Sequence, residues 1–526
     1  MLHILTGRAG SGKTTQVLRR MREAGERRPQ LLLVPEQASF ETERRFCREN
    51  GNQAGRYGEV LSFTRLENRV LSLGGGAAEP VLDAGGRLLV LYAALRSVQA
   101  NLTVYAMPSQ KPAFLTSLLT TLDELKSYCI TGEQLTQVGE ETEGMDGEKL
   151  RDLGLIFGAY EAMTARGALD PRDRLTRLAE KLRRFPFFQG QDVYLDGFTD
   201  FTPQQGLVLA ELLRQAHSVT LALTYGEGAG EEAVFAPARK TLAWIKGLAA
   251  KVGCPVEEEA LPAGEWERTP PLRHLEQALF AHPMPPYTGP WDGSIVVHEL
   301  PSPREEVAWA AGEIRALVWQ GRVRYRDIVV TARSMDPCWE QLEGVFAQYD
   351  IPLFQADKTD LLQKPLFTLI TAALDAVNGG YLYEDMFRYL KTGLAGLSLP
   401  ECDQLENYVL TWDIWGSRWT GAGGWTRHPG GYHQRFTPQD EETLETLNAL
   451  RLRVIQPLER LRKNAGGTIG EQVLALYQFL EEIHAPEHLE ARSAALLHQG
   501  EPELARQYSQ LWEIFCRALE QCEALL

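Results

Sequence analysis

Short, mainly apolar runs alternate with longer stretches of helical character over the first 84 residues of the chain. Residues 2–5, 31–34 and 60–63 form the apolar runs, and such runs are typical of strands that are buried on both faces of a parallel sheet. The stretches that start near residues 14 and 39 combine good helix formers with charged residues. The alternation of strand and helix with short connections predicts an α/β fold with a doubly wound parallel sheet.

A long stretch without strand character follows. From residue 85 to 185 the apolar positions recur every three or four residues, which predicts a run of amphipathic helices. Apolar runs at 193–195 and 219–223 then resume the strand pattern. We therefore interpret residues 85–185 as a helical insertion in one sheet domain, which is formed by residues 1–84 and 186–290. A separate helical domain is the alternative.

A proline-rich stretch separates this domain from the rest of the chain. Residues 270–293 hold six prolines, which predicts a domain boundary. Beyond it, apolar runs at 294–297, 327–333 and 351–354 predict strands of a second α/β unit, which we place over residues 291–378.

The last part of the chain, residues 379–526, has a helical pattern that a glycine-rich loop interrupts. Four tryptophans lie just before or inside this loop. Their rings could stack on DNA bases, but we interpret them as residues that pack in a core or between domains. The pattern stops inside a helix at Leu526, before the sheet of the second unit is complete, so we expect a fragment of a longer chain. The four tryptophans beside the loop are Trp412, Trp415, Trp419 and Trp425.

The first strand runs directly into a glycine-rich turn that fits the pattern G-x-x-x-x-G-K-[ST] at every fixed position. The glycines let this turn point its backbone N–H groups inward, and together with the N-terminus of the following helix these groups form an anion site. Lys13 can reach the β and γ phosphates of a nucleoside triphosphate, and the Thr14 hydroxyl can ligate Mg²⁺. Because a strand precedes the turn and a helix follows it, an accidental glycine-rich turn is disfavoured. The predicted nucleotide-binding residues are Gly7, Arg8, Ala9, Gly10, Ser11, Gly12, Lys13, Thr14 and Thr15.

A second candidate for metal binding stands at the tip of a later strand. The apolar run 193–195 ends on Asp196, and a P-loop protein holds its Mg²⁺ with an Asp in this position. We therefore predict Thr14 and Asp196 as the metal ligands, with a turn Asp of no metal role as the alternative. The next residue is Gly197 rather than a carboxylate that could activate water, which weakens the case for vigorous hydrolysis.

Length and charge narrow the classes of function. A chain of 526 residues is too long for one compact core and suggests three or four domains. The net charge of −16 argues against a free-standing, non-specific nucleic-acid binder, because phosphate contacts need a basic surface. A net negative charge is still compatible with a channel that is locally basic.

Cysteine usage and hydropathy indicate a cytoplasmic protein. The seven cysteines form no CxxC pair, so the sequence predicts neither a disulfide framework nor a zinc site, and we interpret them as reduced core thiols. No signal peptide opens the sequence, and its longest apolar run is too short to span a bilayer. We expect no membrane partner.

Several segments, in order along the chain, resemble the AddB family, whose members are subunits of the bacterial AddAB helicase–nucleases. The resemblance covers essentially the whole chain, and the segment LDGFTDFTPQ is far more specific than the phosphate-binding turn. Besides that turn, the matching segments are residues 33–37, 62–66, 195–204, 303–306 with 325–328, and 406–410.

The resemblance implies a P-loop NTPase fold with a superfamily 1, UvrD-like helicase body, built from RecA-like parallel sheets with helical insertions. Residues 1–84 and 186–290 would then form domain 1A, and residues 85–185 its insertion 1B. Residues 291–378 would begin domain 2A, and residues 379–526 would form a truncated insertion 2B.

The same resemblance implies an activity. The AddAB complex unwinds and resects double-strand DNA ends for recombinational repair, until a Chi sequence is recognised, and an AddA-type subunit supplies the motor. The implied partners are that subunit, in a heterodimer, and DNA; the implied cofactors are ATP and Mg²⁺. The family's nuclease domain and its 4Fe–4S cluster belong to a C-terminal region that this sequence ends before. The family's helicase relatives use an adenine-contacting Gln and a last-motif Arg that are not found here, so we expect ATP binding with little or no turnover.

The resemblance also assigns a Chi-reading surface. The family's Chi-contacting positions correspond here to Gln37, Ser39, Phe63 and Arg65. Asn68 stands where some members have a Trp. Both segments follow strands of one parallel sheet, so they are expected side by side at its C-terminal edge. The Phe63 ring could stack on a base, and Gln37 and Arg65 could bond base edges or phosphate. The alternative is that Phe63 is a core residue and Arg65 a structural ion pair.

A different class of function is a P-loop phosphotransferase that acts on a small molecule. Such an enzyme is usually shorter, with one sheet and a lid. The second α/β unit expected after residue 290 favours a two-lobed translocase instead.

Overall fold

The computed structural model describes residues 1–526 except 52, 77–80, 109–110, 166–168, 227–232, 263–268 and 355–360. The chain divides into two compact units, one made of residues 1–266 and 362–526 and the other of residues 267–361. Each unit is described by itself below. Among the described residues, no helix combines the length and the apolar character that crossing a bilayer requires.

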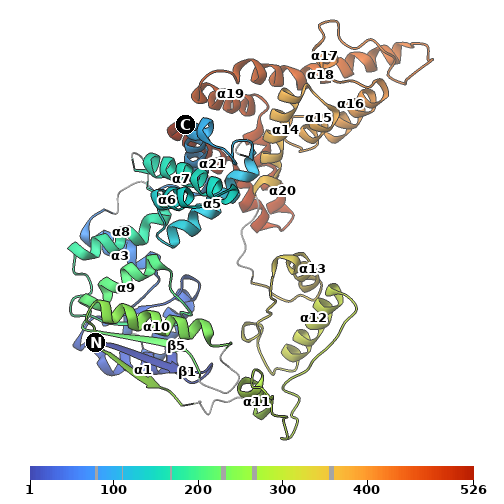
Figure 1. The fold of residues 1–526 in the computed structure, drawn as a ribbon. Coiled ribbons are helices and arrows are strands. Elements are labelled where there is room, and N and C mark those ends of the chain that lie inside the picture. The colour runs from blue at the N-terminus through green and yellow to red at the C-terminus, as the bar shows by residue number, and fades with distance from the viewer. Residues whose placement is uncertain are drawn as a thin grey trace. The chain divides into compact units, whose positions relative to one another are not determined.

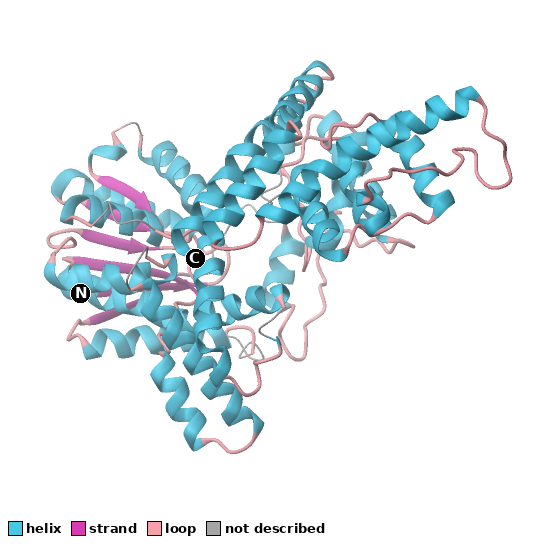
Figure 2. Ribbon diagram, turned by 90° about the horizontal axis from the view of Figure 1, so that it is seen from above, coloured by secondary structure: helices cyan, strands magenta, loops and turns pink. Residues whose placement is uncertain are grey.

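The first unit contains a parallel sheet in which, among the described residues, six strands have the order β3-β2-β4-β5-β1-β6 (Figure 2, magenta). All of its pairings are parallel. This confirms the α/β fold with a parallel sheet that the apolar runs predict. The strands are β1 (Leu2–Gly7), β2 (Gln30–Leu33), β3 (Gly58–Leu61), β4 (Asp192–Leu195), β5 (Ser218–Thr224) and β6 (Val256–Ala260).

Helices cover both faces of this sheet (Figure 1). Successive side chains of a strand point to opposite faces. On β2, Leu32 packs in the core with α1 and α2, whereas Leu31 and Leu33 pack in the core of the other face with α3, α8, α9 and α10. The strands are therefore buried on both sides, as their mainly apolar sequences predict. The helices are α1 (Lys13–Ala24), α2 (Ser39–Asn50), α3 (Phe63–Gly74), α8 (Arg174–Arg184), α9 (Pro203–Gln215) and α10 (Ala236–Lys251).

Four helices between β3 and β4 have a hydrophobic core of their own. Buried side chains of α4, α5, α6 and α7, among them Leu91, Leu122 and Phe157, pack together. The chain then returns to the sheet through α8, whose Leu178 and Leu182 belong to the core of the sheet. The four helices are α4 (Ala84–Val98), α5 (Pro112–Ser127), α6 (Gly132–Glu141) and α7 (Met145–Thr164).

A buried charge network ties these helices to the segment that leads into α8. The Asp170 carboxylate is fully buried, lies 2.9 Å from Arg87 Nε and 3.0 Å from Lys126 Nζ, and accepts hydrogen bonds from the Tyr160 hydroxyl and the Arg172 backbone N–H, both at 2.9 Å. Burial alone would raise the pKa of this carboxyl, but Lys126, the Arg172 amide and Arg87 together lower it below its ordinary value. The ionised form of Asp170 is therefore part of the folded structure.

The last part of the first unit, residues 362–526, consists of helices joined by loops and forms no strand. At its end Gln521 Nε2 donates to Asp83 Oδ2 at 2.8 Å, and Leu525 packs on the core of α4–α7. The helices are α14 (Pro365–Gly379), α15 (Tyr383–Leu390), α16 (Leu399–Trp412), α17 (Ser417–Thr420), α18 (Pro438–Asn464), α19 (Ile469–Glu482), α20 (Ala485–His498) and α21 (Pro502–Leu525).

Three of the four tryptophans in this region are packing residues, as predicted. Trp412, Trp419 and Trp425 are buried, and the rings of Trp419 and Trp425 meet edge to face at 5.3 Å. Trp415 is 53% exposed and does not share that role. Among the cysteines, which are all free thiols, Cys402 is buried while Cys47 and Cys129 are exposed, so the interpretation as core thiols is wrong for the latter two.

The second unit contains α11 (Pro270–Ala278), α12 (Pro303–Trp319) and α13 (Trp339–Gln348). The predicted strands at 294–297, 327–333 and 351–354 are not formed among the described residues of this unit. Apolar composition alone suggested them, but a strand also needs a hydrogen-bonding partner. Here α12 and α13 pack with Ile351, while Val297, Val329 and Phe354 are 89%, 81% and 90% exposed.

Candidate functional site

The loops that carry the predicted site residues meet at one edge of the sheet. Because all strands are parallel, their C-terminal ends lie along the same edge. The loops after β3, β2 and β4 are neighbours in the strand order, and β5 separates β4 from β1. Lys13, which follows β1, and Asp196, which follows β4, therefore lie on the same edge of the sheet.

The turn after β1 combines two glycines of left-handed conformation with the N-terminus of a helix. Gly10 and Gly12 have φ values of 81° and 86°, in the left-handed region that favours glycine. At Gly7 a Cβ atom would lie 2.3 Å from Ser11 Oγ, so the turn leaves no room for a side chain there. Helix α1 begins at Lys13, and its N-terminal end follows the turn directly. The glycines of the turn thus adopt backbone conformations that suit the predicted nucleotide-binding loop, and a helix begins directly after it.

The ammonium group of Lys13 folds back over this turn. Its Nζ donates to the carbonyl oxygens of Gly7 and Arg8, both at 2.8 Å. The cationic group is thus held at the loop, where an incoming phosphate could exchange for the carbonyl oxygens. The neighbouring Thr15 hydroxyl accepts a hydrogen bond from Arg45 at 3.0 Å, which fixes it toward α2.

The predicted metal ligands, Thr14 and Asp196, would supply one hydroxyl and one carboxylate. Asp196 is 7% exposed, and its Oδ1 accepts a hydrogen bond from the Gly197 backbone N–H at 3.0 Å. Within the described part of the chain, no group of three or more His, Cys, Asp or Glu side chains is arranged to hold a metal ion. Mg²⁺ is commonly held by one or two carboxylates together with waters and substrate phosphates. A site made of Thr14, Asp196 and a triphosphate is consistent with that chemistry.

Four of the predicted DNA-binding side chains are accessible. Gln37 is exposed in the single turn Glu36–Ala38 that follows β2. Ser39 opens α2 and its hydroxyl donates to the Glu36 carbonyl oxygen at 3.0 Å. Arg65 and Asn68 lie on exposed positions of α3. Arg65 NH1 is 3.1 Å from the Glu43 carboxylate on α2, a contact that links the two segments.

Phe63 is placed differently from the other four. Its side chain is 7% exposed and belongs to the core of the sheet. Its ring meets that of Phe198 edge to face, with a centroid distance of 5.7 Å and an angle of 67° between the rings. Because the Phe63 ring is buried in this core, stacking on a base would require it to move.

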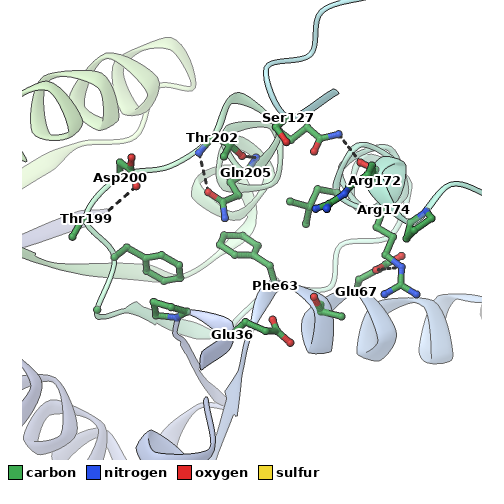
Figure 3. A pocket seen from close by; sticks show the side chains of 17 residues that line it. Glu36, Phe63, Glu67, Ser127, Arg172, Arg174, Thr199, Asp200, Thr202 and Gln205 are labelled. Atoms are coloured by element: carbon green, nitrogen blue, oxygen red, sulfur yellow. Dashed lines mark hydrogen bonds and ion pairs between the residues drawn. The ribbon is translucent and has the colours of Figure 1, made fainter. Parts of the chain in front are cut away.

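A cavity of about 650 Å³ opens beside these loops (Figure 3). The loops after β2, β3 and β4 supply one part of its wall, and the segment around the start of α8 supplies another. Hydroxyl, amide, carboxylate and guanidinium groups line it, together with Phe63 and Phe198. The labelled lining residues in Figure 3 are Glu36, Phe63, Glu67, Ser127, Arg172, Arg174, Thr199, Asp200, Thr202 and Gln205.

Sequence reasoning missed the basic wall of this cavity. Arg172 and Arg174 precede β4 by about twenty residues and belong to no recognised motif, so only the fold brings them to the sheet edge. Arg174 Nε lies 3.5 Å from the Glu67 carboxylate, which is 3% exposed. Burial raises the pKa of Glu67, against the opposing effect of Arg174 and Arg177. The one available signal was the density of arginines between residues 172 and 184.

Comparison with known proteins points to one family. A family model described as "ADDB, N-terminal" matches residues 4–276. The chain is 32% identical to the B subunit of the ATP-dependent helicase/deoxyribonuclease of Acetivibrio thermocellus, over 99% of this chain and 47% of that protein. Proteins of the same name from Pelotomaculum thermopropionicum and Desulforudis audaxviator are 33% and 34% identical over the same shares. The chain thus spans about half the length of the curated relatives it matches.

Proposed function

We infer, from the premise that the chain belongs to the AddB family, that it is the nucleotide-binding and DNA-binding part of an ATP-dependent helicase–deoxyribonuclease. The complex would unwind and resect double-strand DNA ends for recombinational repair in the cytoplasm. The observation that carries this proposal is the common edge of one parallel sheet, which presents the Lys13 turn, Asp196 and the Gln37–Arg65 surface together. The partner would be an AddA-type subunit in a heterodimer.

The proposal extends to the domain organisation of a superfamily 1 helicase. Residues 1–84 and 186–290 would form domain 1A, with residues 85–185 as insertion 1B. Residues 291–378 would begin domain 2A and residues 379–526 would belong to insertion 2B. Support for a separate second domain comes from residues 267–361, which form a compact unit of their own. The relatives that match are about twice as long as this chain.

At the nucleotide site, Lys13 would exchange its bonds to the Gly7 and Arg8 carbonyls for bonds to phosphate oxygens. Gly10 and Gly12 keep the backbone N–H groups open toward the same position. Thr14 and Asp196 would hold Mg²⁺, which neutralises charge on the phosphates when it is bound. Because Gly197 follows Asp196, no carboxylate stands beside the metal ligand to activate water, and we propose binding with little turnover. The family's 4Fe–4S cluster would lie in the part of the relatives that this chain does not cover.

At the DNA site, exposed polar groups would read a single strand. The Gln37 amide and the Arg65 guanidinium have the donor geometry for base edges, and both are accessible. Asn68 lies one turn after Arg65 on α3 and would face the same strand. Ser39 fixes the turn that presents Gln37, through its bond to the Glu36 carbonyl. We propose that these residues recognise the Chi sequence.

The Chi assignment predicts the behaviour of a double variant. Gln37→Ala with Arg65→Ala should abolish the response to Chi, because two base-reading side chains worth about 1–3 kcal/mol each are lost. The measurement is the change in DNA degradation at Chi by the complex of the full-length protein with its partner subunit. Glu43→Gln is the matched control, since it breaks the ion pair with Arg65 but keeps the guanidinium. An unchanged Chi response in the double variant would remove this assignment.

A further inference from the structure

Helix α8 carries a concentration of positive charge, most of which lies outside the cavity at the sheet edge. Residues 172–184 contain six arginines and lysines and two acidic residues, in a chain whose net charge is −16. Leu178, Ala179 and Leu182 bury one side of this helix in the core of the sheet. The basic residues therefore occupy the side that faces away from the core.

The spacing of these residues makes a continuous stripe. Arg174, Arg177, Lys181 and Arg184 follow one another at intervals of three, four and three residues, which places neighbours on the same side of a helix. Helix α8 has 11 residues and is therefore about 16 Å long. We call Arg174, Arg177, Lys181, Arg183 and Arg184 the α8 ridge.

Two cavities lie along this ridge, and α3 contributes to the wall of both. At the start of α8, Arg174 lines the cavity at the sheet edge together with Thr64 and Glu67 of α3. At the end of α8, a second cavity of about 810 Å³ is lined by the other four ridge residues and by Gly74 at the end of α3. The ridge thus runs from the proposed DNA site along the contact between α3 and α8.

The second cavity has an excess of positive charge. Its lining contains four cationic side chains and one carboxylate, that of Glu180. Lys181 Nζ donates to the Gly74 carbonyl oxygen, and a Cβ at Gly74 would lie 2.8 Å from Lys181 Cε, so glycine allows this approach. Arg183 Nε is 3.5 Å from the Glu211 carboxylate, which Arg214 also contacts. These contacts hold Lys181 and Arg183 in position, and the cationic side chains of the lining outnumber its one carboxylate by four to one.

We propose that the α8 ridge binds the phosphodiester backbone of DNA that extends beyond the residues proposed to read bases. This inference rests on the proposed function. Guanidinium groups bind phosphate oxygens strongly, and such contacts position a strand without reading its sequence. The ridge would hold the strand at the sheet edge while Gln37 and Arg65 contact its bases. Both single strands and duplexes offer this backbone, so the test compares the two.

The test variant is Arg177→Gln with Arg183→Gln and Arg184→Gln, in the full-length protein bound to its partner subunit. Binding to oligo(dT) and to a blunt duplex is measured over a range of salt concentrations in EDTA. For whichever DNA the ridge contacts, the slope of log affinity against log salt should fall by roughly 2 to 3, since each phosphate contact contributes about 0.7 on a single strand and 0.9 on a duplex. Affinity should fall on the order of tenfold.

Two further variants make the result decisive. Arg492→Gln with Arg506→Gln and Arg517→Gln removes the same charge from exposed positions of α20 and α21 and should leave slope and affinity unchanged. Arg→Lys substitution at the three ridge positions keeps the charge and should retain most of the binding. If the triple Gln variant unfolds, Arg184→Gln alone should lower the slope by about 0.7. Slopes equal to the parent's for both DNAs would overturn the ridge proposal, whereas a parent complex that binds neither DNA would overturn the proposed function.

Discussion

Replacement of Lys13 by alanine is expected to abolish ATP binding by the protein. The Lys13 ammonium is held at the turn, where it donates to the Gly7 and Arg8 carbonyl oxygens. Hydrogen bonds that involve a charged group are worth about 1.5–3 kcal/mol each, so losing two of them to phosphate should raise the Kd at least about 100-fold. Titration of the protein with a fluorescent ATP analogue measures this change.

The matched control for this variant is Lys149→Ala. Lys149 is a partly exposed lysine on α7 that contacts Asp146 at 3.3 Å, so its loss should leave the Kd unchanged. Because Lys13 also braces the turn, the thermal midpoint of each variant is compared without nucleotide. Equal ATP affinity in Lys13→Ala and the parent protein would show that the turn is not a nucleotide site.

The second large effect is expected at the buried charge network. Asp170→Asn keeps the shape of the side chain but removes the carboxylate that faces Arg87 and Lys126. Breaking a buried ion pair typically costs about 3–5 kcal/mol, because the remaining charges stay buried without a counter-charge. Hydrogen exchange of the α4, α5 and α7 backbone amides measures this loss directly, since those helices carry the partners of Asp170.

Asp146→Asn is the control for this prediction. Asp146 contacts Lys149 on the surface and is 81% exposed, and exposed ion pairs contribute little to stability. We expect faster exchange in Asp170→Asn but not in Asp146→Asn. Equal exchange rates in the two variants would mean that the network does not hold the four helices to the sheet domain.

Sequence reasoning predicted those strands whose own residues show that both of their faces are buried. The runs at 31–34 and 219–223 are apolar because both faces of their strands are covered, and this leaves a visible signal. The strand β6, with the sequence Val256–Ala260, escaped prediction because it is an edge strand whose three glutamates are exposed. The runs in the second unit gave the same signal as true strands, yet they have no partners in the described residues.

The same distinction separates the two halves of the site. The turn around Lys13 is contiguous, so its pattern could be read directly from the sequence. The cavity beside Phe63 is built from loops that follow three strands and from Arg172 and Arg174, and only the strand order brings them together. For Phe63 the sequence left two roles open, stacking on a base and packing in the core. Its burial against Phe198 could not be predicted, because it depends on how distant segments pack.

The central claim is that an unpaired DNA strand lies across the sheet edge beside the nucleotide turn. The most direct measurement is photocrosslinking of the complete complex to a Chi-containing single strand with photoreactive bases, followed by identification of the crosslinked peptides. We predict adducts within residues 35–39 and 62–68. Efficient crosslinking that falls entirely outside these two segments would contradict the claim.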